Sequence, residues 1–169
     1  DGPSTSNVIL TKTGKGLLVL GNSGNNTSIT GGVVVAEGCV KLTNKNALGN
    51  AVPVQIKNGA TIDVNSIGGG YVAKSCSVSG NGWDGNGAIQ NNGEAGPNYN
   101  QATPLAALTL AGNTSVGGSS QLVFINSSYN AIPWELGAYT LTKIGSGRLM
   151  PANTTMTGTG RFIVSEGSL

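Results

Sequence analysis

The chain of 169 residues contains no histidine and few charged residues. Only 9% of its residues are Asp, Glu, Lys or Arg, whereas an ordinary domain carries about 25%. The absence of histidine removes the side chain most often used as a general acid or base and as an imidazole metal ligand. The nine Lys and Arg residues are dispersed and give a net charge of +2. Nucleic-acid binding, which normally needs a concentrated basic face, is therefore not expected.

Long apolar segments are also absent. No run approaches the roughly 18 apolar residues of a membrane span, and no basic-plus-apolar signal segment is present. The two cysteines, Cys39 and Cys76, allow at most one disulfide.

Glycine and short β-branched segments dominate what is there. The chain has 28 glycines, and its apolar residues come in short bursts such as GLLVL, GVVVAEG and RFIVSEG. The bursts end in Gly or Asn, which adopt the positive φ of tight turns at little cost. No segment has the spacing of an amphipathic helix. The sequence therefore predicts an all-β chain of many short strands.

A period of 22 residues relates neighbouring strands. The matching pairs are Val40 and Ile62, Leu42 and Val64, Val54 and Cys76, and Ile56 and Val78. Two different strands that repeat at one spacing are typical of a solenoid, and strands without helices favour a right-handed parallel β-helix of roughly seven coils. The alternative, an antiparallel sandwich, needs two-residue hairpin turns, which are not obvious here. In the β-helix register, Cys76 points inward and Cys39 lies on another strand, which disfavours a disulfide between them.

One motif occurs twice. LTKTGKGLLVL begins at Leu10 and LTKIGSGRLM at Leu141, so both contain L-T-K-x-G-x-G. Glu37 and Gly38 follow the first copy as Glu166 and Gly167 follow the second. The shared positions are Leu10, Lys12, Gly14 and Gly16 in the first copy and Leu141, Lys143, Gly145 and Gly147 in the second.

With the glycines at 31, 32 and 38 and the segment NALG at 46–49, this pattern resembles the autotransporter-associated β-strand repeat of Gram-negative surface proteins. The resemblance covers nearly the whole chain. It implies that residues 1–169 form one β-helical passenger segment, located outside the cell or on its surface. It also implies a parent protein with a C-terminal outer-membrane barrel, through which alone a membrane would be involved. The second copy stops in mid-repeat, so we expect the chain to be part of a longer protein.

Enzymatic chemistry is not expected. The carboxylates are Asp1, Glu37, Asp63, Asp84, Glu94, Glu135 and Glu166. Polysaccharide hydrolysis needs two carboxylates about 5 to 9.5 Å apart. Asp63 and Asp84 are 84 − 63 = 21 residues apart, which would place them on neighbouring coils. They form a chance match, a pair or a calcium site, but no hydrolase motif or calcium-binding nonapeptide repeat accompanies them. We predict no catalytic residue, no cofactor and no metal.

One long loop, residues 79–101, offers a candidate ligand site. Trp83, Asp84 and Tyr99 would contact a glycan or a protein if the loop protrudes. The alternative is that the loop folds back and Trp83 covers the flank of the rod. Trp134, with Tyr129 and Pro133, is expected to pack in the interior.

Three functions follow from these patterns. The first is a structural stalk that presents adhesive regions. The second is a carbohydrate- or protein-binding adhesin module that uses the loop. The third is a unit that stacks end to end into a filament, because open coils expose unpaired strand edges.

Overall fold

The computed structural model describes residues 7–21, 29–49, 53–67, 74–94, 105, 107–125 and 130–169. Within these ranges the chain forms strands and no helix, so no helix there could span a membrane. The first strands are β1 (Ile9–Lys12), β2 (Leu17–Leu20), β3 (Gly32–Val35), β4 (Gly38–Leu42), β5 (Val54–Ile56), β6 (Ala60–Asp63), β7 (Ser75–Gly80) and β8 (Ile89–Gln90). They are followed by β9 (Ala107–Gly117), β10 (Leu122–Phe124), β11 (Ile132–Gly137), β12 (Thr140–Lys143), β13 (Leu149–Pro151), β14 (Thr154–Gly158) and β15 (Arg161–Val164).

All pairings between these strands are parallel, and they form two long ladders. The A ladder runs β1–β3–β5–β7–β9–β11–β14, and the B ladder runs β2–β4–β6–β8–β9–β12–β15. The long strand β9 belongs to both, through residues 107–110 in A and 114–117 in B. The result is a large parallel sheet that curls nearly into a barrel. A short third ladder pairs β10 with β13.

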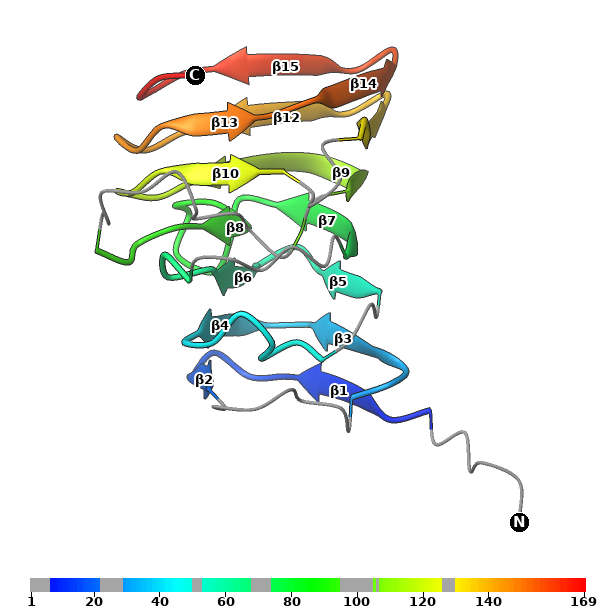
Figure 1. Cartoon of the computed structure of the whole chain (residues 1–169), viewed down its shortest axis with the longest axis vertical. Helices are drawn as coiled ribbons and strands as arrows, with labels where there is room; N and C mark the ends of the chain where they lie inside the picture. The colour runs from blue at the N-terminus through cyan, green and yellow to red at the C-terminus, as the bar shows by residue number, and fades with distance from the viewer. Residues whose placement is uncertain are drawn as a thin grey trace.

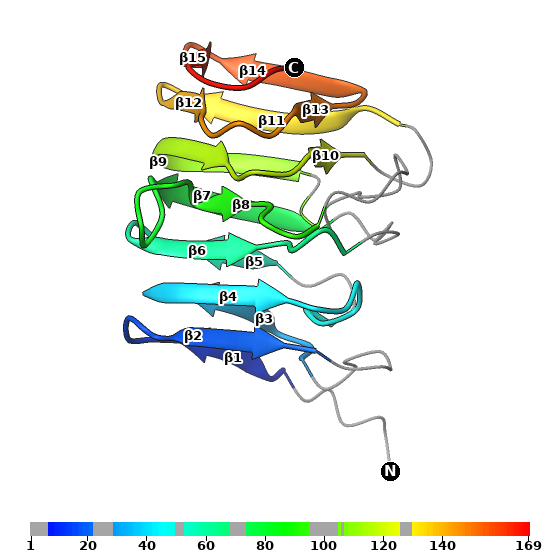
Figure 2. The same ribbon diagram turned by 90° about the vertical axis from the view of Figure 1, so that its left-hand side faces the viewer.

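Successive layers are stacked along the long axis of the molecule (Figures 1 and 2). β1 and β2 lie at one end, and β14 and β15 lie at the other. The predicted register is confirmed where strands pair, since Val40 lies opposite Ile62, Val54 opposite Cys76 and Ile56 opposite Val78. The alternative of an antiparallel sandwich is wrong, because each layer pairs in parallel with the next. The arrangement is consistent with a parallel β-helix.

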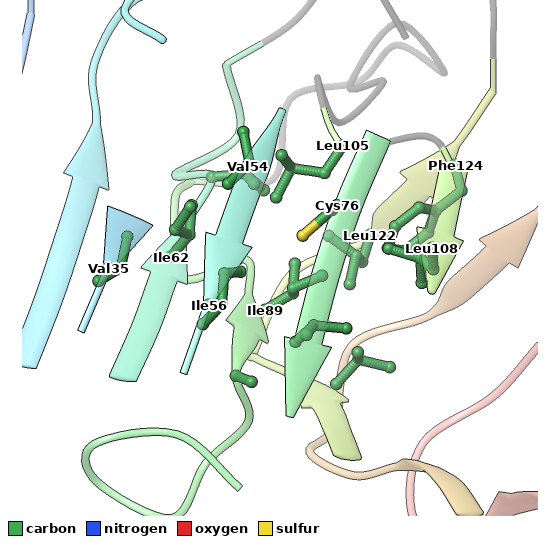
Figure 3. Close-up of a cluster of buried hydrophobic side chains, with 14 of the residues drawn as sticks. Val35, Val54, Ile56, Ile62, Cys76, Ile89, Leu105, Leu108, Leu122 and Phe124 are labelled. Atoms are coloured by element: carbon green, nitrogen blue, oxygen red, sulfur yellow. The ribbon is translucent and has the colours of Figure 1, made fainter. Parts of the chain in front are cut away.

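The core lies between the ladders, where inward side chains of successive layers form continuous apolar lines (Figure 3). One line runs through the A ladder from end to end. It contains Leu10, Val33, Val54, Cys76, Leu108, Trp134 and Met156. Its middle members are buried, and Met156 at the end is 38% exposed.

Trp134 packs in the interior as expected. It is fully buried, and its ring meets Phe124 edge-on at 5.0 Å and Phe162 at 6.3 Å between centroids. Such edge-to-face contacts add to the burial of apolar area. Tyr129 lies outside the described residues.

Both cysteines are buried thiols without a disulfide, as the register predicts. Cys76 occupies an inward position of the A ladder, whereas Cys39 lies in β4 of the B ladder. Burial, with help from the nearby Asp63 carboxylate, raises the pKa of Cys39 to about 11. Burial also raises the pKa of Cys76. Both side chains therefore act as small apolar residues rather than as reactive thiols.

Candidate functional site

Both copies of the repeated motif place a lysine at an inward position of an apolar line. Lys12 ends β1 and continues the line of Val35 and Ile56 in the A ladder. Lys143 ends β12 and lies between Val116 and Val164 in the B ladder. A buried ammonium group is costly unless all its protons are hydrogen-bonded.

Each lysine meets this requirement with three backbone carbonyl oxygens. The Lys143 Nζ donates to the carbonyls of Ile144 and Gly145, both at 2.7 Å, and of Glu166 at 3.3 Å. Two acceptors belong to the turn that follows the lysine, and the third belongs to the next layer. An ammonium group has three protons, so the group is saturated and ties the turn to the layer above it.

The first copy repeats this geometry. The Lys12 Nζ donates to the carbonyl oxygens of Thr13 at 3.0 Å, Gly14 at 2.5 Å and Glu37 at 3.0 Å. We call these arrangements the first corner (residues 13–16 with 36–38) and the second corner (residues 144–147 with 165–167). The motif residues Leu10 and Leu141 precede the corners at inward positions, and Leu141 is fully buried.

The glycine after each glutamate is required by the same contacts. Gly38 has a φ of +75°, and a Cβ there would lie 2.6 Å from the Gly16 oxygen and closer still to the Gly14 oxygen. Gly167 has a φ of +71°, and its Cβ would lie 2.6 Å from the oxygens of Gly145 and Gly147. A side chain would thus collide with the carbonyls that surround the lysine. This explains why Glu-Gly follows both copies.

The two copies belong to different ladders. The first corner follows a strand of the A ladder, whereas the second follows a strand of the B ladder. The second copy therefore does not begin a coil at the same place as the first. L-T-K-x-G-x-G with its distant Glu-Gly encodes a corner, which the fold uses at two positions around the sheet.

The second corner is more enclosed than the first. Lys143 is only 1% exposed, and burial lowers its pKa although the Glu166 carboxylate opposes the shift. Gly145 and Gly147 lie against backbone atoms of Gly118 and Ser120 in the preceding layer. For Gly14 and Gly16, by contrast, no atom of the described chain lies within 4 Å of a built Cβ.

A groove of about 710 Å³ lies beside the first corner. Its lining residues come from turns that follow four successive strands of the A ladder, β1, β3, β5 and β7. They are Thr13, Lys15, Ala36, Glu37, Gly38, Asn58, Gly59 and Trp83. The groove therefore crosses stacked layers rather than belonging to one loop.

Trp83 combines the two alternatives that the sequence left open. Its backbone N–H donates to the Thr61 hydroxyl oxygen at 3.1 Å, and that hydroxyl donates to the Gly87 carbonyl at 2.9 Å. The described part of the loop thus folds back onto β6. The Trp83 side chain is nevertheless 49% exposed and lines the groove. Tyr99, the other aromatic residue predicted to contact a ligand, lies outside the described residues.

Asp84 fastens the turn that carries Trp83 and does not line this groove. Its carboxylate accepts hydrogen bonds from the Asn86 backbone and side chain, both at 3.0 Å, and from the Gln90 side chain at 2.7 Å. Burial alone would raise the pKa of Asp84, but these hydrogen bonds outweigh it and hold the pKa below its usual value. Asp84 is therefore a structural carboxylate.

Asp63 and Asp84 are connected, but through amide groups. The Asp63 carboxylate accepts from the backbone N–H groups of Asn65 at 2.9 Å and Asn92 at 3.1 Å. The Asn92 side chain donates to Gln90, which in turn donates to Asp84. Both carboxylates are thus engaged in turn structure. In the part of the chain that the structure describes, no three His, Cys, Asp or Glu residues are grouped to hold a metal ion.

A second, smaller groove of about 460 Å³ lies beside the second corner. It is lined by Gly85, Asn86, Asn92, Gly118, Ser119, Ile144, Gly145, Ser146 and Glu166. None of these side chains is aromatic. The Glu166 carboxylate accepts from the Gly145 backbone N–H at 2.9 Å.

The chain matches no protein-family model, no curated protein and no solved structure. The likeness of its motifs to the autotransporter-associated repeat therefore stays a prediction.

The contrast between the corners gives a matched pair of substitutions. We expect Gly147→Ala to lower the free energy of unfolding by about 2–3 kcal/mol, because the new methyl group collides with the Ser120 carbonyl. Gly16→Ala, the equivalent change in the first corner, is expected to change it by less than about 0.5 kcal/mol. Urea denaturation followed by circular dichroism measures both. Equal losses at the two positions would refute the difference in enclosure.

Proposed function

We propose that the chain is a stalk segment of a secreted or surface-displayed autotransporter-like protein, which holds adhesive regions away from the cell. Its fold in this proposal is a right-handed parallel β-helix of roughly seven coils, one for each strand of the A ladder. The right-handed sense follows from the strong preference of parallel crossover connections. With a layer spacing of about 4.8 Å, the rod is about 35 Å long.

The observation that supports this function is the continuity of both ladders from one end to the other. Each layer is hydrogen-bonded to the next, and the inward apolar lines run through successive layers. The corners add hydrogen bonds between layers through Lys12 and Lys143. An element whose contacts all connect neighbouring layers is suited to keeping a fixed length.

A height measurement tests the stalk. The purified chain is anchored by its C-terminus to a supported bilayer and carries a dye at its N-terminus. A stalk gives a narrow distribution of dye heights near 35 Å. In urea, the unfolded chain gives a broad distribution with an end-to-end distance of about 70 Å. A broad distribution in the absence of urea, with the fold intact by circular dichroism, would contradict a stalk.

End-to-end stacking of copies is a second candidate. What favours it is the free side of the first corner, where Gly14 and Gly16 meet no described atom although Gly145 and Gly147 each receive the preceding layer. The strand edges of β1 and β2 are unpaired on that side within the described residues. The occupant we propose is the last layer of a second copy of this chain.

Light scattering after size-exclusion chromatography tests stacking. We expect the apparent mass to rise with protein concentration, and Gly16→Arg to keep the chain monomeric because the long side chain occupies the free side. Circular dichroism of Gly16→Arg checks that the fold is retained. A monomer at all concentrations would contradict stacking and leave the stalk as the function.

A further inference from the structure

We infer that the groove beside the first corner binds an uncharged oligosaccharide, with one sugar ring stacked on the indole of Trp83. This site goes beyond the stalk function and does not depend on it, because it rests on the side chains of the groove.

The indole is held ready for such a contact. The Trp83 backbone is fixed by its hydrogen bond to Thr61, and the turn after it by the bonds between Asp84 and Asn86. Gly82 and Gly85, on either side, have φ values of +88° and +79°, which favour glycine. The ring nevertheless leaves half of its surface in water. A fixed and exposed aromatic face loses little conformational freedom when a sugar packs on it.

The polar groups of the groove complement sugar hydroxyls. Thr13 contributes a hydroxyl, Lys15 an ammonium, Glu37 a carboxylate and Asn58 an amide. Together they donate and accept hydrogen bonds, and each sugar hydroxyl does both. The charges of Lys15 and Glu37 cancel, so the lining favours neither an anionic nor a cationic ligand. These features select an uncharged saccharide.

The layout of the groove favours a chain of sugars over a single ring. Its lining spans the turns after four successive strands, which at about 4.8 Å per layer is roughly 14 Å. In Figure 2, the turns that join β1 to β2, β5 to β6 and β7 to β8 lie one above another along the same edge of the molecule. At Gly59, a built Cβ meets no described atom within 4 Å, which leaves the groove open between Asn58 and Trp83.

Tryptophan fluorescence provides a direct readout, because the chain has two tryptophans and Trp134 is fully buried. Acrylamide quenching therefore reports on Trp83. The probes are cellotetraose, maltotetraose and chitotetraose, with a tetramer of galacturonic acid as the charged comparison. We expect at least one uncharged tetramer to shield Trp83 from acrylamide and to bind in calorimetry with the weak affinity, in the micromolar to millimolar range, of a shallow open site.

Variants decide whether binding occurs in this groove. Trp83→Ala is expected to weaken binding at least tenfold, and Asn58→Ala several-fold. Tyr139→Ala, which removes another exposed aromatic ring that does not line the groove, is expected to leave binding unchanged. Thermal unfolding checks that each variant is folded. The proposal is overturned if no uncharged tetramer binds, if only the galacturonic acid tetramer binds, or if a folded Trp83→Ala binds as well as the wild type.

Discussion

A lysine ammonium group surrounded by three carbonyl oxygens is the interaction on which each corner of this fold depends. Turns at the corners of a stacked sheet point carbonyl groups toward one another, and those groups need donors once they leave water. Lys12 and Lys143 supply the donors from positions that would otherwise hold an apolar side chain. The glycines at 38 and 167 leave the room that this arrangement needs. Charge, turn and layer contact are thus one unit.

Because that unit is local, the fold can use it at different places around the sheet. The first corner follows the A ladder and the second follows the B ladder, yet each lysine has the same kind of partners. Between them, β9 extends through both ladders, and its register shifts after Leu110. The interior fills to match: near the C-terminal end, Phe124, Trp134 and Phe162 occupy space that Val, Ile and Leu fill in earlier layers.

Much of the layered fold could be predicted from the sequence, because a 22-residue period directly places Val40 beside Ile62 and Val54 beside Cys76. The period fails between β7 and β9, where a long insertion separates paired strands and Val78 meets Leu110, 32 residues further along. The lysine corners could not be predicted from hydrophobic pattern, because a charged residue at the end of a strand is normally assigned to the surface. The Glu-Gly pairs were a visible signal, but their contact is with a backbone carbonyl that any residue carries.

The candidate site was predicted only in part for a related reason. Trp83 stands out in a sequence with 5% aromatic residues, and its indole does line a groove. Thr13, Lys15, Glu37 and Asn58 come from turns that only the stacking of layers brings together. Asp84 was placed with Trp83 because it is adjacent in sequence, but its carboxylate is engaged by Asn86 and Gln90. The most direct test of the whole account is the free energy of unfolding of Lys143→Met, compared with that of Lys15→Met, which changes an exposed lysine of the first corner. The account predicts a loss of about 3 kcal/mol for Lys143→Met, since three carbonyl groups lose their charged donor, and less than about 0.5 kcal/mol for Lys15→Met. A Lys143→Met chain as stable as the wild type would contradict it.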